Sequence, residues 1–388
     1  MKILVLAQEI GGNAPGVLYE RLLSALSSLC ELDVAACSYH PSVPVKVRRH
    51  YPVSYPRMKH WAMRLMLSLT GRDWLSFAKA RSFSQTVEGD YDLVLSLCSN
   101  YRFWSLEAGF RLKRERALPW VCFMVDAIPA PVAWNGNGLR RRAVLRRLKK
   151  MGPKMDYVAS ICDEMLAYEL PFLHLGKGVR SRAYLPPVPL ETVDTSPGAP
   201  GNPVFLYAGR IYGKRTARYL LDAFAAFLAD SPNARLVFLG LKEDFAPYVA
   251  LCPPAVAVQI RMEPWTKDVQ PWIDGATALI DIDADLPHDV YLSSKMLSYL
   301  RQRRPIICET GPDSPSRRIF GGIPSILQCG HNAEELYKAM HRAVDGFGEF
   351  DYSDRAAVIR EAQEMPQRFY RDLETYVTKG HEKDSSSL

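Results

Sequence analysis

The strongest constraint on the fold comes from residues 204–224, where a basic turn joins an apolar run to an amphipathic helix. Val204 to Ala208 form an uninterrupted apolar and aromatic run, which is typical of a fully buried strand. A short turn begins at Gly209, and Thr216 is in position to cap the helix that follows. Apolar residues then recur at the helical period through Phe224. A buried strand that turns directly into an amphipathic helix is typical of an α/β protein.

The turn carries two fixed cations, Arg210 and Lys214, next to the N-terminus of the expected helix. Free backbone N–H groups and the positive end of the helix dipole favour an anion at such a place. Both side chains can form charge-assisted hydrogen bonds with phosphate oxygens. The alternative is an ordinary strand-to-helix turn whose two cations are solvated. Taken alone, the turn leaves both interpretations open.

A second stretch, Val290 to Cys308, predicts a helix that starts at Ser293–Lys295, continues over Met296–Arg304 and leads into a strand at Pro305–Cys308. The two stretches share a pattern: a strand, GR-x3-K and a helix are followed about eighty residues later by SSK-x3-YL-x4-PII. This pattern resembles the C-terminal domain of retaining glycosyltransferases with the GT-B fold, glycosyltransferase family 4.

The resemblance implies an α/β fold of the GT-B type, with two Rossmann-like domains facing across a cleft. It implies that Arg210 and Lys214 hold the donor diphosphate and act in catalysis, and that Ser294 and Lys295 help to bind the sugar or the ribose. The expected activity is that of a hexosyltransferase with a UDP- or GDP-linked donor. Retention at the anomeric carbon is expected, without a metal and without a cofactor, since the nucleotide-sugar is a substrate.

One part of the chain departs from the family pattern. Many members carry E-x7-E near the SSK helix, but Val290 stands where the first Glu would fall and Ser298 where the second would. His288 and Asp289 precede this point and can meet sugar hydroxyls. Either Asp289 and Ser298 take over the missing contacts, or donor selectivity differs, or activity is weak.

The first half of the chain contributes further candidates. Gly11 and Gly12 follow a strand at Lys2–Ala7, and the resemblance matches them to a glycine pair that faces the donor phosphates. Asp126 follows a strand at Trp120–Val125, and ligands gather at the carboxyl ends of parallel strands. In the family, a His or Asp near this place contacts the transferred sugar or the acceptor. The alternative for Asp126 is a turn or helix-capping role.

Two candidates in the second half have competing interpretations. Trp265 follows an expected strand at Val256–Met262, and the family contacts the nucleotide base there, so its ring can stack on the base or can pack in the core. The DID and DAD triplets of Ala278–Asp285 invite a metal site. We expect no metal there, because the run precedes the SSK helix, where the family places a metal-free donor-sugar loop.

The length of 388 residues predicts two domains. We expect an acceptor domain at 1–195, then a proline- and glycine-rich linker, and a nucleotide-sugar donor domain at 203–350. A helix at 351–378 is expected to cross back to the first domain, as the resemblance implies.

Charge is unevenly spread along the chain, whose net charge is +7. Residues 1–190 carry 27 basic and 15 acidic side chains, a balance of +12, and residues 191–388 carry 22 and 27, a balance of −5. A basic half fits an anionic membrane, a nucleic acid or an acidic glycan. Nucleic acid is not expected, because the chain has no aromatic nucleic-acid motif. Scattered cysteines and short apolar runs favour a cytoplasmic protein, one that can bind peripherally to the cytoplasmic face of a membrane.

Two segments are candidates for such a surface. Leu139–Lys150 interleaves seven cations with apolar residues, which suits an anionic bilayer or, alternatively, a solvated helix face. His60–Phe77 mixes cations with Trp, Met and Leu, which fits an interfacial helix or an ordinary core-facing one.

The expected function is transfer of a sugar from a nucleotide-sugar to a lipid-linked or cell-surface glycan. Two other classes stay open. A sugar-nucleotide epimerase of the same fold would turn over the donor without an acceptor. A non-catalytic nucleotide-sugar-binding protein is favoured by the missing Glu pair.

Overall fold

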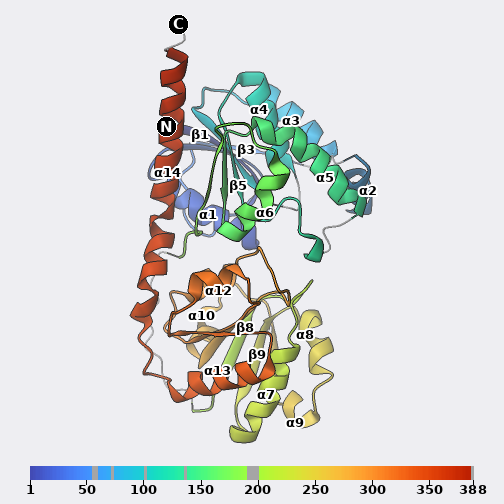
Figure 1. The fold of residues 1–388 in the computed structure, drawn as a ribbon, viewed down its shortest axis with the longest axis vertical. Helices are drawn as coiled ribbons and strands as arrows, with labels where there is room; N and C mark the ends of the chain where they lie inside the picture. The colour runs from blue at the N-terminus through green and yellow to red at the C-terminus, as the bar shows by residue number, and fades with distance from the viewer. Residues whose placement is uncertain (55–59, 71–73, 100–102, 135–137, 190–200, 386–388) are drawn as a thin grey trace. The chain divides into compact units, whose positions relative to one another are not determined.

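In a computed structural model of the chain, the described residues are 1–54, 60–70, 74–99, 103–134, 138–189 and 201–385 (Figure 1). The chain divides into two compact units. Unit 1 comprises residues 1–187 and 362–388, and unit 2 comprises residues 188–361. Most of the expected linker falls at 190–200, outside the described residues.

Unit 1 is built on a seven-stranded sheet in which every pair of neighbouring strands is parallel. The strands, in spatial order, are β3 (Arg49–Pro52), β2 (Glu31–Tyr39), β1 (Lys2–Ile10), β4 (Leu93–Cys98), β5 (Trp120–Met124), β6 (Tyr157–Ser160) and β7 (Arg180–Ala183). The central strands β4 and β5 are buried along their whole length, which explains their continuous apolar sequences.

Helices cover this sheet, and the longest of them comes from the end of the chain (Figure 1). The helices are α1 (Ala14–Leu26), α2 (His60–Thr70), α3 (Trp74–Thr86), α4 (Trp104–Arg116), α5 (Gly138–Met151), α6 (Asp163–Leu173) and α14 (Ala356–Ser385), with short 3-10 turns η1 (Val132–Trp134) and η2 (Gly152–Lys154). Close packing of α4 on the sheet depends on Gly109, because a Cβ there would lie 2.1 Å from Nε1 of Trp120.

Helix α14 joins unit 1 from Ala362 onward. Its Phe369 ring packs edge-on against Phe123 of β5, with 5.4 Å between ring centroids. Asp372 lies 3.0 Å from the guanidinium of Arg182, on the edge strand β7. These contacts tie the last helix to the β5–β7 side of the unit 1 sheet.

Unit 2 is built on a six-stranded sheet, again parallel throughout. The strands, in spatial order, are β10 (Ile260–Pro264), β9 (Arg235–Gly240), β8 (Val204–Ala208), β11 (Ala278–Ile282), β12 (Ile306–Glu309) and β13 (Ile326–Cys329). The helices are α7 (Arg218–Asp230), α8 (Lys242–Val249), α9 (Pro254–Ala257), α10 (Gln270–Asp274), α11 (Ser294–Tyr299), α12 (Pro315–Phe320), α13 (Ala333–Asp345) and the 3-10 turn η3 (Tyr352–Arg355).

Two expected elements of unit 2 have different bounds in the structure. The helix expected to continue to Arg304 ends at Tyr299. The buried Arg304 side chain instead donates to the carbonyl oxygens of Ala276 and Asp274, both at 2.6 Å, and Pro305 disfavours a helical backbone at Arg304. The strand expected at Val256–Met262 was also placed too early, because its first residues belong to α9 and β10 starts at Ile260.

No helix in the described ranges is both long enough and apolar enough to cross a membrane. The eight cysteines are all free thiols, and five of them are buried.

Candidate functional site

Both sheets arrange their loops around a topological switch point. In unit 2, β9 and β10 follow β8 on one side of the sheet, and β12 and β13 follow β11 on the other. In unit 1, β1 and β4 are the corresponding pair. Ligands of open parallel sheets bind outside the carboxyl ends of the strands at this point. The loops that follow β8 and β11 therefore form the candidate ligand site of unit 2.

Arg210 lies in the loop directly after β8 and is held by a carboxylate of helix α8. Its Nε and Nη2 atoms donate to the two carboxylate oxygens of Asp244, at 2.8 and 3.1 Å. These hydrogen bonds raise the pKa of Arg210. The side chain is still 57% exposed, so solute anions can reach it. Arg210 is thus oriented in advance, and its Nη1 atom, which makes no hydrogen bond with a described residue, can donate to an oxyanion such as phosphate.

Lys295 lies on the other side of the switch point, in the first turn of α11. Its Nζ is 2.9 Å from Oδ1 of Asp281, a fully buried residue of β11. The Ser293 hydroxyl donates to the same oxygen at 2.9 Å. Burial acts to lower the pKa of Lys295, but the Asp281 carboxylate outweighs that effect and the pKa is raised. Lys295 therefore stays cationic at neutral pH.

Two glycines make room for this lysine and for the turn beside it. Gly209 has a φ of +148°, and a Cβ there would lie 3.0 Å from Cδ of Lys295. Gly240, at the end of β9, would place a Cβ 2.1 Å from the Gly209 oxygen. The Lys295 Nζ also lies 5.0 Å from the centroid of the Tyr207 ring. The Gly209–Arg210 turn and Lys295 are therefore one connected group at the end of β8.

Lys214 is exposed, but Arg215, which the sequence patterns did not single out, turns inward. Its Nε is buried without a hydrogen-bond partner among the described residues, and its guanidinium lies 5.3 Å from the Tyr212 ring centroid. Burial acts to lower the pKa of Arg215, but neighbouring tyrosines and the carboxylates of Asp281 and Asp283 raise it overall. Arg215 is thus a further cation beside the switch point.

The helix after this turn starts slightly later than expected. Helix α7 begins at Arg218, and Ala217 occupies the N-cap position without a side-chain hydrogen bond. The prediction that Thr216 is the N-cap residue of this helix is therefore wrong, because Ala217 holds that position. Its Oγ1 accepts from the Arg218 backbone N–H at 3.2 Å, which stabilises the turn instead.

The Asp-rich run around β11 is engaged in contacts within the protein. The Asp283 carboxylate is buried and accepts from the Ser314 hydroxyl at 2.8 Å. Glu309, at the end of β12, lies 2.8 Å from Nδ1 of His331. Within the described ranges, no cluster of three or more His, Cys, Asp or Glu side chains is placed to hold a metal. Metal-independent action stays a prediction.

Asp283 is expected to make unit 2 less stable as pH rises. Burial raises the pKa of Asp283 to about 7, and the Asp281 carboxylate adds to the shift. An unfolded Asp ionises near pH 4. Between about pH 4 and pH 7 the folded state therefore keeps a proton that the unfolded state has lost, so the free energy of unfolding falls with rising pH.

Asp283→Asn should remove this loss while keeping an acceptor for Ser314. Urea unfolding at acidic and alkaline pH measures the difference, and the variant should gain stability over the wild type only on the alkaline side. Asp285→Asn is the matched control, since Asp285 is exposed two residues further on. The same pH dependence in wild type and Asp283→Asn would show that Asp283 does not titrate in this way.

The other predicted site residues between β11 and the end of α11 differ in their contacts and burial. His288 Nδ1 lies 2.7 Å from a carboxylate oxygen of Asp313, and both side chains are largely exposed. Asp289 is buried, and its Oδ1 accepts from the next backbone N–H at 2.8 Å, so it stabilises its own loop. Ser294 and Ser298 lie on α11 and are half-buried. Contact of these four predicted residues with a donor stays a prediction.

Trp265 follows β10 at the same edge of the sheet and is 62% exposed. The alternative that it packs in the core is therefore wrong. Its ring is accessible for stacking, and the predicted contact with a nucleotide base stays a prediction.

The glycine pair of unit 1 lies after β1, at the switch point of that sheet. Gly11 and Gly12 have φ values of +75° and +81°. A Cβ on Gly11 would lie 2.0 Å from the His40 oxygen, whereas one on Gly12 would meet no atom within 4 Å. The Asn13 side chain accepts from the Gly16 N–H at 2.9 Å and caps α1. Packing therefore accounts for Gly11, while Gly12 leaves open space for close approach of a ligand.

Asp126 lies just after β5 and is partly exposed. Burial raises the pKa of its neighbours Tyr19 and Glu169, and the Asp126 charge adds to both shifts. Glu169 accepts from the Ile128 N–H at 3.0 Å. The Tyr19 hydroxyl is buried without a hydrogen-bond partner among the described residues. Asp126 thus belongs to a polar group at the carboxyl edge of the sheet, and its role toward sugar or acceptor stays a prediction.

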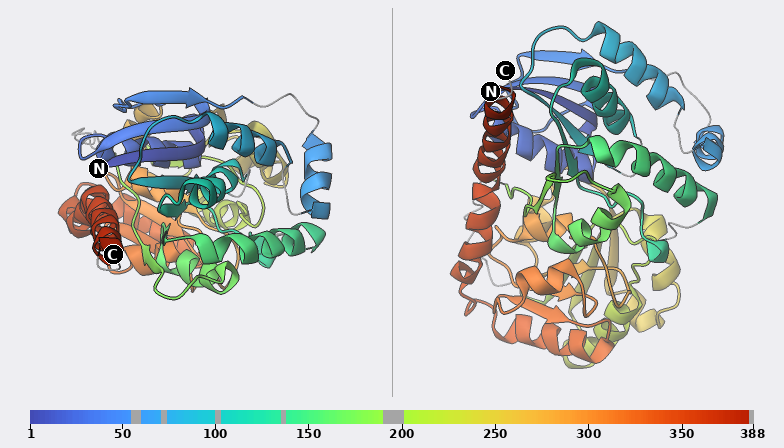
Figure 2. Two further views of the ribbon diagram at one scale, coloured as in Figure 1. Left: turned by 90° about the horizontal axis from the view of Figure 1, so that it is seen from above. Right: turned by 45° about the horizontal axis from the view of Figure 1, so that its top comes forward.

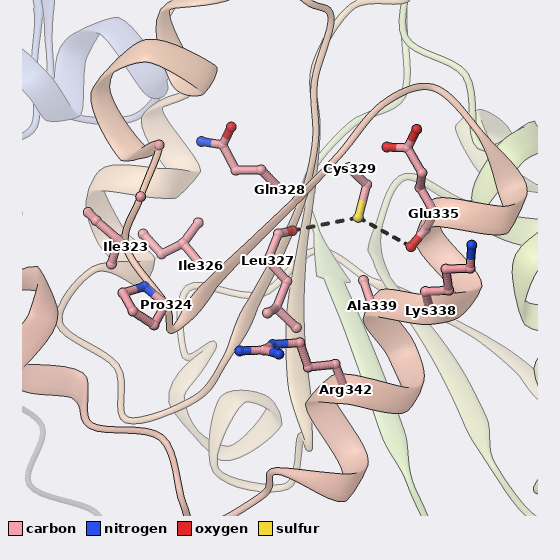
Figure 3. A pocket seen from close by; sticks show the side chains of 12 residues that line it. Ile323, Pro324, Ile326, Leu327, Gln328, Cys329, Glu335, Lys338, Ala339 and Arg342 are labelled. Carbon is pink, nitrogen blue, oxygen red and sulfur yellow. Dashed lines mark hydrogen bonds between the residues drawn. The ribbon is translucent and has the colours of Figure 1, made fainter.

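A pocket of about 580 Å³ in unit 2 lies apart from these residues (Figure 3). Apolar side chains of β13 and the turn before it face charged side chains of α13. Its lining is Gly321, Gly322, Ile323, Pro324, Ile326, Leu327, Gln328, Cys329, Glu335, Lys338, Ala339 and Arg342. None of the site residues expected from the sequence lines it, so it is not the expected donor site.

Two Rossmann-like units with parallel sheets define the GT-B fold, and solved structures of that fold match the whole chain. The lipopolysaccharide outer core galactosyltransferase WaaB, in its apo form, matches with a TM-score of 0.58 and 15% identity over 100% of both chains. HepE of Anabaena, in complex with UDP and glucose, matches with a TM-score of 0.61 and 15% identity over 100% of both chains. A putative UDP-N-acetylglucosamine 2-epimerase from Listeria monocytogenes matches with a TM-score of 0.55 and 12% identity over 97% of both chains.

The expected GT-B fold is therefore confirmed. No protein-family model matches the chain, and no curated protein matches it significantly. Membership of glycosyltransferase family 4 stays a prediction.

Proposed function

We propose that this protein is a glycosyltransferase that moves a hexose from a nucleotide-sugar to a glycan acceptor. The observation that carries the proposal is the group of cations at the unit 2 switch point: Arg210, Lys214, Arg215 and Lys295. Such a group suits a diphosphate better than an uncharged sugar. A uridine nucleotide is the first choice, because the similar HepE structures hold UDP, UDP-glucose, or UDP and glucose.

The difficult step of the proposed reaction is departure of the nucleoside diphosphate. The bond between the anomeric carbon and the phosphate oxygen breaks, and the electron pair leaves with the oxygen. The acceptor hydroxyl bonds to the carbon and passes its proton to an oxygen of the departing diphosphate. Arg210, Lys214 and Lys295 would meet more charge in the transition state than in the bound donor, so they accelerate the step. We propose retention at the anomeric carbon, with no metal and no cofactor.

The acceptor is proposed to be a lipid-linked or cell-surface glycan, reached at the cytoplasmic face of a membrane. The balance of +12 over residues 1–190 supports an anionic surface as a partner. Polysaccharide synthesis is the matching process, since such acceptors grow by successive sugar transfer.

A sugar-nucleotide epimerase is the second candidate, because the similar Listeria structure is that of a putative UDP-N-acetylglucosamine 2-epimerase. An epimerase would convert the donor without an acceptor and would release no nucleotide in a single turnover. A non-catalytic nucleotide-sugar-binding protein would bind the donor and leave it unchanged. Incubation with the donor alone, and then with the donor and an acceptor extract, followed by chromatography of the nucleotide products, separates these two classes from the proposed transferase.

Nucleotide binding is expected to stabilise the protein against heat. A ligand at one hundred times its Kd adds about 2.7 kcal/mol to the free energy of unfolding. We therefore expect a rise in Tm with UDP or its sugars, and a smaller or no rise with CMP. GDP, ADP and their sugars are tested in the same way.

Arg210→Ala should abolish the rise, because the diphosphate loses its oriented partner. Arg235→Ala is the matched control, since Arg235 is exposed at the first position of β9, at the end of the sheet opposite the loops that follow β8 and β11, so it should keep the rise. Absence of any rise with every nucleotide tested would overturn the proposed donor site.

A further inference from the structure

Helix α2 of unit 1 exposes large apolar side chains on one face. Trp61, Leu65 and Leu69 recur every fourth residue, and their exposed fractions are 65%, 51% and 59%. Met66 is 39% exposed beside them. Residues spaced in this way lie above one another on a helix. The core-facing alternative is therefore wrong for these side chains, and several large apolar groups gathered on one exposed face mark an interaction surface.

Helix α5 packs against α2, and Figures 1 and 2 show the pair at the periphery of unit 1. Its Val144, Leu148 and Met151 are buried. The exposed positions of α5 are spaced along the opposite face: Gly138, Leu139, Arg142, Arg146, Lys149 and Lys150. This helix therefore turns a strongly basic face away from the core.

Apart from the half-buried Arg140, the cations of α5 fall into two groups. Arg147 pairs with the buried Glu107, and Arg141 donates to the Ala130 oxygen at 2.5 Å and to the Tyr168 hydroxyl at 3.0 Å. These arginines fasten α5 to its own unit. Arg142, Arg146, Lys149 and Lys150 form no ion pair with any described residue. The alternative that this segment is simply a solvated helix face therefore applies to at most four of its seven cations.

We propose that the apolar side chains Trp61, Leu65, Met66 and Leu69, together with the four exposed cations of α5, form a docking surface for an anionic lipid bilayer. The apolar groups enter the interface of the bilayer, and the cations attract its acidic headgroups. Neither α2 nor α5 contains an Asp or Glu, so nothing on these helices repels such a surface.

Charge complementarity favours an anionic bilayer over a second copy of the chain or a nucleic acid. A second copy of the chain would bring its own basic α5 against the first, and like charges oppose that contact. A nucleic acid would be attracted by the cations but would find one aromatic ring among aliphatic side chains, a poor stacking platform. An anionic bilayer satisfies both the apolar and the basic part.

Vesicle co-sedimentation of the full chain tests the surface. Vesicles of phosphatidylcholine with phosphatidylglycerol should sediment the protein at least about tenfold more strongly than phosphatidylcholine alone, and added salt should weaken the binding. The variant Leu65→Ser with Leu69→Ser should lower the partition coefficient at least about tenfold on the anionic vesicles. Replacing Arg142, Arg146, Lys149 and Lys150 by Gln should abolish the preference for anionic lipid.

The matched control is Leu251→Ser with Val258→Ser. These apolar residues of unit 2 are 85% and 78% exposed, so the control changes surface apolarity elsewhere and should sediment like the wild type. Unchanged Tm values show that each variant is folded. Wild-type binding by the α2 variant, or equal losses in the unit 2 control, would overturn the proposal.

Two further outcomes would also overturn it. One is a concentration-dependent dimer that the α2 variant abolishes, with no vesicle binding by the wild type. The other is tight binding to single-stranded RNA, with no vesicle binding. This surface would bring the protein to its proposed lipid-linked acceptor, and only that biological purpose rests on the proposed function. Vesicle binding needs no nucleotide, so failure of the surface and failure of the nucleotide-dependent rise in Tm are separate results.

Discussion

Arg210→Ala is expected to lower kcat/KM for sugar transfer by at least two orders of magnitude while the protein stays folded. The physical reason is that a preoriented donor aimed at developing charge contributes about 2.7–4 kcal/mol to transition-state stabilisation. Arg210 meets this condition, because both oxygens of Asp244 hold its guanidinium while the side chain stays 57% exposed. The folded state should lose little, since exposed ion pairs contribute about 0–1 kcal/mol.

The measurement is the rate of nucleotide release with an acceptor extract and the donor varied from well below to well above its KM, alongside urea unfolding. Arg235→Ala is again the control, because it removes an exposed arginine of unit 2 at the opposite end of the sheet from the switch point. Asp244→Asn separates orientation from charge: it keeps the Arg210 cation but weakens its fixed geometry, so an intermediate loss is expected. Turnover of Arg210→Ala within threefold of the wild type would rule out the assigned role, whatever the unfolding curves show.

The sequence predicts the scaffold of this site well, because continuous apolar runs mark buried parallel strands. β8, β11 and β12 lie where such runs lie, and the turn at Gly209–Arg210 follows directly. The proximity of Lys295 to that turn follows only from the strand order in the structure, which makes β8 and β11 neighbours.

The partners of the cations could not be predicted in the same way. Asp244 reaches Arg210 from a helix that starts after the next strand, and no local spacing links the two residues. Arg215 stands beside Lys214 in the sequence, yet one side chain turns inward and the other outward. The backbone of an irregular turn decides this direction, and periodicity applies only to regular helices and strands.

Helix α2 shows a second limit of sequence patterns. A stripe of apolar residues at helical spacing has the same appearance whether a core or the solvent lies against it. Only the packing of α2 on α5 shows that Trp61, Leu65 and Leu69 face outward. The opposite case is Arg304, which the helical pattern placed at the end of a helix but whose side chain is buried against backbone carbonyls.

Asp281→Ala is expected to destabilise unit 2 by about 3 kcal/mol or more, because it leaves a buried lysine without its partner. Asp281 is fully buried, and the Lys295 side chain is only 16% exposed. The amine then has to remain charged in a poorly solvated position or lose its proton, and both options cost free energy. Urea unfolding at neutral pH measures the loss. Asp285→Ala, an exposed neighbour on the same segment, should stay within about 0.5 kcal/mol of the wild type.

The double variant Asp281→Leu with Lys295→Met tests the mechanism of that loss. Replacing both members of a buried pair by apolar side chains removes the unpaired charge, so much of the lost stability should return. The double variant should nevertheless bind nucleotide more weakly, since the switch point has lost one of its cations. The two measurements thus separate stability from binding: Asp281 holds Lys295, and the proposed role of Lys295 is to bind the ligand. If Asp281→Ala unfolds at the wild-type urea concentration, the ion pair does not support the site.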